Sequence, residues 1–68
     1  MKENFEIILK AFETIEIFNE NNIFIGEIQN NEENEKIIHI KQRDNLLKFT
    51  YYNDNITLVL FGNYYKIS

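Results

Sequence analysis

The arrangement of apolar residues after Ile23 constrains the fold more than any other feature of this sequence. From that point the apolar residues occur in short runs that polar turns separate. Short runs rich in Ile, Phe and Tyr are typical of β-strands. The turns are too short for parallel crossovers, so we expect an antiparallel meander. Its five predicted strands are Ile23–Gln29, Lys36–Lys41, Leu46–Tyr52, Ile56–Phe61 and Tyr64–Ile67.

Side-chain alternation fixes the pairing of two of these strands. A two-residue loop at positions 54–55 places Tyr51 opposite Leu58 and Phe49 opposite Leu60, so that apolar residues share one face. A three-residue loop would mix apolar and charged residues on that face. The sequence therefore predicts the two-residue loop.

The last two strands are predicted to form a second hairpin through Gly62-Asn63. Glycine at the first central position is typical of a type II′ turn. This turn pairs Phe61 with Tyr64 and adds the final strand to the same sheet. One face of that sheet is then the core, and the other is an aromatic face with five candidate binding residues: Lys48, Tyr52, Phe61, Tyr64 and Lys66.

The N-terminal segment is predicted to be a helix that ends near Phe18. Its apolar residues recur at the spacing of one helical face: Phe5, Ile8, Leu9, Phe12 and Ile15. The alternation across Thr14–Phe18 leaves a strand open there, with residues 19–22 as a hairpin turn. We expect an α+β domain in which the helix packs on the sheet and residues 1–68 form a single domain.

The size and cysteine content of the chain restrict how this domain is stabilised. With 68 residues and no cysteine, the chain has no disulfide framework and no thiolate metal site. The core must be stabilised by packing alone or with the help of an oligomer.

Charge is divided unevenly along the sequence. Residues 1–35 contain nine Glu and two Lys, whereas residues 36–68 contain five basic residues and two Asp. A surface formed by the first half would attract basic partners and repel nucleic acid. The candidate acidic surface comprises Glu13, Glu16, Glu20, Glu27, Glu32 and Glu33.

Catalytic and metal chemistry find little support in the sequence. There is one histidine, His39, and one serine, at the C-terminus, so a nucleophile with a base has few candidates. The loop 30–35 lacks the Asp spacing and central Gly of an EF-hand. We predict a protein that is not an enzyme and that needs no metal or cofactor.

The N-terminal residues do not resemble a secretory signal, and no apolar run has the length of a transmembrane helix. We therefore expect a cytoplasmic protein that has no membrane partner. Abundant Asn and Ile beside scarce Ala, Gly and Pro indicate an AT-rich genome, such as that of a low-GC bacterium or its phages.

The aromatic face is compatible with three kinds of partner. Exposed rings beside Lys resemble a platform on which nucleic-acid bases stack, but a net charge of −4 weighs against phosphate binding. The face also fits a homodimer interface. A protein partner is the third possibility, because Tyr is a common anchor in protein interfaces.

The chain is small, acidic and cysteine-free, has an AT-rich composition, and is Glu-rich over residues 13–35. In these respects it resembles phage-encoded inhibitors of bacterial defence nucleases, such as anti-CRISPR proteins. The resemblance is one of general character and rests on no motif. It implies a binder without catalytic activity that acts in a bacterial host.

We therefore predict a non-catalytic inhibitor or regulator that binds a protein with a basic surface. The alternatives are a small nucleic-acid-binding domain that uses the aromatic face, or a homo-oligomeric structural module. The basic C-terminal half departs from a fully acidic mimic of DNA.

Overall fold

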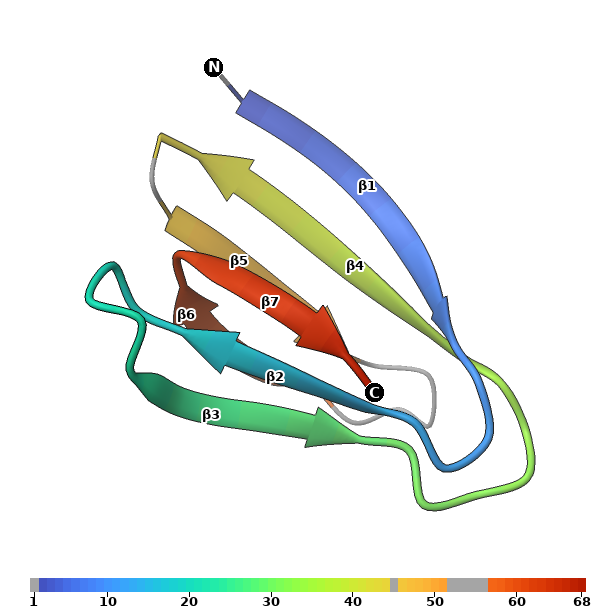
Figure 1. The fold of residues 1–68 in the computed structure, drawn as a ribbon. Coiled ribbons are helices and arrows are strands. Elements are labelled where there is room, and N and C mark those ends of the chain that lie inside the picture. Colours follow the sequence, from blue (N-terminus) through green and yellow to red (C-terminus); the bar gives the residue numbers. More distant parts are fainter. Residues whose placement is uncertain (1, 45, 52–56) are drawn as a thin grey trace.

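The computed structural model describes residues 2–44, 46–51 and 57–68 (Figure 1). These residues form two antiparallel sheets, one with the strand order β1-β4-β5-β6 and one with the order β3-β2-β7. The strands are β1 (Lys2–Leu9), β2 (Thr14–Phe18), β3 (Phe24–Gln29), β4 (Lys36–Arg43), β5 (Leu46–Tyr51), β6 (Leu58–Gly62) and β7 (Tyr64–Ile67).

The predicted N-terminal helix is wrong, and with it the α+β class, because the described residues contain no helix. The segment instead forms β1 and β2. In β1, Phe5 and Ile7 are partly buried and Leu9 is buried, whereas Ile8 between them is exposed. This alternation is that of a strand with one buried face. The alternative of a strand at Thr14–Phe18 is confirmed by β2.

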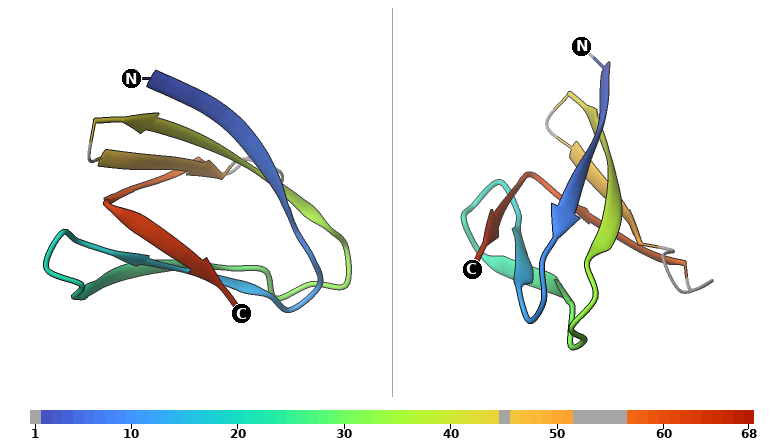
Figure 2. Two further views of the ribbon diagram at one scale, coloured as in Figure 1. Left: turned by 45° about the horizontal axis from the view of Figure 1, so that its top comes forward. Right: turned by 90° about the vertical axis from the view of Figure 1, so that its right-hand side faces the viewer.

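The first four strands form one long hairpin that is bent in its middle. β2 pairs with β3 next to the tight turn at residues 19–23, and β1 pairs with β4 farther from that turn. Both arms of the hairpin pass from one sheet to the other, at residues 10–13 and at residues 30–35. We call these two segments the corner. Figure 2 shows the two halves of the hairpin in separate layers joined at the corner.

The five strands expected after Ile23 correspond to β3–β7, but a single meander connects only β4, β5 and β6. The predicted register between β5 and β6 is confirmed, because Tyr51 lies opposite Leu58 and Phe49 opposite Leu60. The expected loop at positions 54–55 lies outside the described residues.

The predicted hairpin at Gly62-Asn63 is wrong. β7 leaves the four-stranded sheet and pairs with β2, where Tyr65 lies opposite Ile17. A type II′ turn requires a positive φ at its first central residue, and Gly62 does not have one. Gly62 instead lies where a Cβ atom would clash with Ile17 Cγ2. Here glycine permits the close approach of two strands.

The core lies between the two sheets. The buried side chains come from both layers: Leu9, Ile15, Ile17, Ile28, Ile38, Ile40, Leu47 and Phe49. The Phe49 ring meets the Tyr65 ring edge-on at 5.3 Å across the layers. We call the side of each sheet that faces the other sheet its inner face, and the opposite side its outer face.

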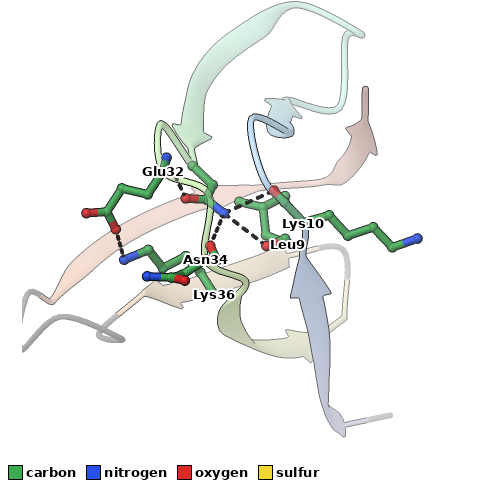
Figure 3. Close-up of polar contacts among 6 residues, drawn as sticks. Leu9, Lys10, Glu32, Asn34 and Lys36 are labelled. Atoms are coloured by element: carbon green, nitrogen blue, oxygen red, sulfur yellow. Dashed lines mark hydrogen bonds and ion pairs between the residues drawn. The ribbon is translucent and has the colours of Figure 1, made fainter.

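The side chain of Asn30 connects the two parts of the corner, and Figure 3 labels its partners Leu9, Lys10 and Asn34. Its side chain is buried, and the amide nitrogen donates to the carbonyl oxygens of Leu9 at 3.1 Å, Lys10 at 3.0 Å and Asn34 at 2.8 Å. Its side-chain oxygen accepts from the backbone nitrogen of Glu32 at 3.1 Å. Glu32 also pairs with the buried ammonium group of Lys36. These contacts give hydrogen-bond partners to backbone groups where the chain changes sheets, and the Lys10 carbonyl also accepts from the backbone nitrogen of Glu13 at 3.2 Å.

Candidate interaction surfaces

Three aromatic side chains form a cluster on the outer face of the three-stranded sheet. The rings of Phe18 and Tyr64 stack with centroids 4.9 Å apart, and the Phe24 ring meets Phe18 edge-on at 6.0 Å. Lys66 Nζ lies 5.7 Å from the centroid of the Phe18 ring. Phe24 is 47% exposed and Tyr64 39% exposed. We call Phe18, Phe24 and Tyr64 the aromatic cluster.

Strand alternation explains why these rings gather. Ile15 and Ile17 of β2 face the core, so Glu16 and Phe18 lie on the outer face. The register places Phe18 opposite Phe24 on one side and opposite Tyr64 on the other. Three aromatic residues from three strands thus occupy one row across the sheet, where cross-strand pairs contact each other directly.

Two of the predicted acidic residues lie next to this cluster. Glu16 is opposite Glu27 on β3 and opposite Lys66 on β7, in the row beside the aromatic one. The remaining four are in connections between strands: Glu20 in the β2–β3 turn, and Glu13, Glu32 and Glu33 at the corner. The structure therefore distributes the predicted acidic set over three places rather than along a helix.

The predicted aromatic face is divided between the two sheets. Tyr64 and Lys66 belong to the three-stranded sheet, whereas Lys48 and Phe61 are neighbours in the four-stranded sheet. Lys48 Nζ lies 5.9 Å from the centroid of the Phe61 ring. Tyr52 lies outside the described residues.

The sequence-based prediction missed Phe18 and Phe24. A helix ending at Phe18 gave that ring no partners, and Phe24 was treated as part of a strand without a surface role. The alternation in Thr14–Phe18 was the available signal, because a strand there places Phe18 opposite the following strand of the hairpin.

The outer face of the four-stranded sheet has a different chemistry. Lys41 on β4 and Lys48 on β5 lie directly opposite each other, and Arg43 follows on the same face of β4. His39 Nε2 lies 3.1 Å from a carboxylate oxygen of Glu6 on β1. A shallow hollow of about 390 Å³ lies over this region. The sequence-based prediction included only Lys48 of these cations.

Residues 2–44, 46–51 and 57–68 contain no group of three or more acidic, His or Cys side chains arranged to hold a metal ion. Nor does this part of the chain form any helix of membrane-spanning length and hydropathy.

No protein-family model, curated protein or solved structure matches the chain.

Proposed function

We propose that this protein is a non-catalytic inhibitor or regulator that binds a protein partner through the outer face of its three-stranded sheet. The observation that carries the proposal is the exposed aromatic cluster, whose rings already pack against one another before a partner is present. Rigid, preorganised aromatic side chains lose little conformational entropy on binding and are frequent hot spots in interfaces.

The charges beside the cluster indicate what kind of partner it suits. Glu16 and Glu27 lie opposite each other in the adjacent row, although like charges in that position destabilise a sheet. A partner with apolar residues that meet the rings and basic residues that meet the two carboxylates would relieve this repulsion. We propose a protein with a mixed apolar and basic surface, in keeping with the acidic first half of the sequence.

The experiment compares surface variants in direct binding to a protein captured from the native host and then purified. Replacing both exposed rings, Phe24→Ala with Tyr64→Ala, is expected to weaken binding by about thirtyfold or more, the loss that corresponds to a hot spot of about 2 kcal/mol. Replacing the two acids, Glu16→Lys with Glu27→Lys, is expected to slow association. Inhibition of the partner's own activity by wild type would establish the inhibitor role.

A matched control comes from the other sheet. Phe61 is also an exposed aromatic residue, so Phe61→Ala removes similar apolar area from a different face. Equal binding by wild type and the Phe24/Tyr64 double variant would refute the proposed surface, as would a larger loss with Phe61→Ala. Sedimentation in which wild type dimerises and the double variant is monomeric would assign the cluster to a second copy of the chain instead.

A further inference from the structure

We propose a second, independent site: the outer face of the four-stranded sheet binds a nucleotide unit, with its phosphate at Lys41, Arg43 and Lys48 and its base on Phe61. Nothing in this site is shared with the aromatic cluster, so it does not depend on the function proposed above.

The cations of this face are placed where they destabilise the free sheet. Lys41 and Lys48 are directly opposite each other across β4 and β5, and like charges in that position repel. None of the ion pairs found between described residues involves Lys41, Lys48 or Arg43. A bound phosphate group would supply negative charge to all three side chains.

Two adjoining hollows provide space for a ligand of this size. The first, of about 390 Å³, is lined by Lys41 and Lys48 together with the polar side chains of Asn4, His39 and Thr50. The second, of about 200 Å³, is lined by Lys41, Lys48, Arg43, Leu46 and Phe61. Because Lys41 and Lys48 border both hollows, a phosphate held between them has hydrogen-bonding groups on one side and an aromatic ring on the other.

Phe61 distinguishes a nucleotide from a simple anion. Its ring is 49% exposed and lies beside Lys48 in the sheet register. An exposed ring next to a cation is the arrangement on which a base stacks while its phosphate is neutralised. Glu6 is the one acidic side chain that lines either hollow, and it faces His39 at 3.1 Å rather than the lysines.

The negative charge of the whole chain does not exclude such a site. At about 0.1 M salt the electrostatic screening length is roughly 10 Å, and the molecule extends 32 Å along its longest axis. The acidic loops of the corner therefore repel a ligand on this face less than its three adjacent cations attract it. Binding is expected to weaken steeply as salt rises.

The test is a titration of the ¹⁵N-labelled protein at low salt, followed by two-dimensional NMR. The probes are inorganic phosphate, thymidine monophosphate and a short oligothymidylate. We expect thymidine monophosphate to shift the amide signals of Lys41, Arg43, Lys48 and Phe61, and phosphate to shift them more weakly. The double variant Lys41→Gln, Lys48→Gln is expected to lose affinity by at least about tenfold.

Two variants separate the roles of charge and ring. Phe61→Leu is expected to weaken thymidine monophosphate and leave phosphate unchanged, whereas Lys66→Gln, which removes a cation from the other sheet, is expected to change neither. The lysine double variant is also expected to be at least as stable as wild type, because it removes a repulsion. That outcome separates a binding role from a structural one.

Several outcomes overturn the proposal. They are the absence of shifts at low salt, equal affinity for phosphate and thymidine monophosphate, or equal losses in the Lys66→Gln control and the lysine double variant. Tighter binding of oligothymidylate than of the monophosphate would identify a nucleic-acid strand as the source of the nucleotide. Equal binding of the two would identify a free nucleotide.

Discussion

At Asn30 a single amide group satisfies the backbone of several segments. The Leu9 carbonyl is at the end of β1, the Lys10 carbonyl follows it, and the Asn34 carbonyl belongs to the β3–β4 loop. Asn30 is only 1% exposed, so losing these hydrogen bonds at a buried position is expected to cost free energy. Asparagine serves here because its side chain combines two donors with an acceptor.

We predict that Asn30→Ala lowers the free energy of unfolding by about 1–3 kcal/mol, the range expected when buried polar groups lose their partner. Urea denaturation followed by circular dichroism measures this difference. Asn31→Ala is the matched control, since Asn31 is the next residue and is exposed. Equal midpoints for the two variants would show that water replaces the amide at no cost.

Asn30 also marks a limit of the sequence-based prediction. The abundance of asparagine, eleven residues in the chain, was interpreted as a sign of AT-rich composition. Nothing in the spacing of Asn30 distinguishes it from Asn31. Asn30 has its role because Lys10, twenty positions earlier in the chain, lies next to it in the folded structure. The sequence does not show that proximity.

For the strands, side-chain alternation predicted the pairing well where one face carries apolar and the other polar residues. Phe49 and Tyr51 face inward and Lys48 faces outward, and this parity was sufficient for the β5–β6 register. In β1 the run Phe5–Leu9 contains adjacent apolar residues and is compatible with both helical and strand periods. Pairing with β4 makes this segment a strand. The local spacing of its residues does not reveal that partner, so it was not sufficient to predict a strand.

The joint between β6 and β7 was beyond prediction for a related reason. Gly62-Asn63 has the composition of a tight turn, but its conformation is determined by packing against β2. Asn63 donates its backbone N–H to the Phe18 carbonyl at 2.7 Å. A glycine required for a close approach and a glycine required for a turn are indistinguishable in one sequence.

We predict that Gly62→Ala destabilises the protein by about 1–3 kcal/mol, the usual range for overpacking. The new methyl group would meet Ile17 Cγ2 and would lie 3.1 Å from the Phe18 carbonyl oxygen, so the end of β6 must move away from β2. Gly26→Ala is the control, because its methyl group would lie 3.6 Å from the Leu60 side chain, an ordinary contact. Thermal unfolding of the two variants measures the difference. Equal melting temperatures would contradict the claim that the backbone at Gly62 packs too closely on Ile17 for a methyl group.

In the whole molecule, the bent hairpin brings the acidic and basic halves of the sequence together. Acidic β1 pairs with basic β4, so the two halves of the sequence do not form two halves of the structure. The Glu6–His39 contact is one result. The glutamates after β1 lie at the corner, at the β2–β3 turn and on the three-stranded sheet, and Asp44 lies between β4 and β5. The cations Lys41, Arg43 and Lys48 remain together on the four-stranded sheet.

The same hairpin makes the two sheets depend on each other for stability. Three connections cross between the layers: β1 to β2, β3 to β4 and β6 to β7. Neither sheet contains a continuous stretch of chain that includes all its strands, and both contribute side chains to one core. We therefore predict that the protein unfolds in a single cooperative transition.

Ile15 and Ile38 provide a matched test, since both are fully buried and each belongs to a different sheet. Ile15→Val and Ile38→Val are each expected to cost about 0.5–1.5 kcal/mol. Each should shift the whole transition, with far-ultraviolet circular dichroism of the backbone and near-ultraviolet circular dichroism of the tyrosines giving the same midpoint. Ile8→Val, at an exposed position of β1, is the control and is expected to shift it little. Midpoints that separate by probe in either core variant would mean that one sheet persists without the other, which the shared hairpin does not allow.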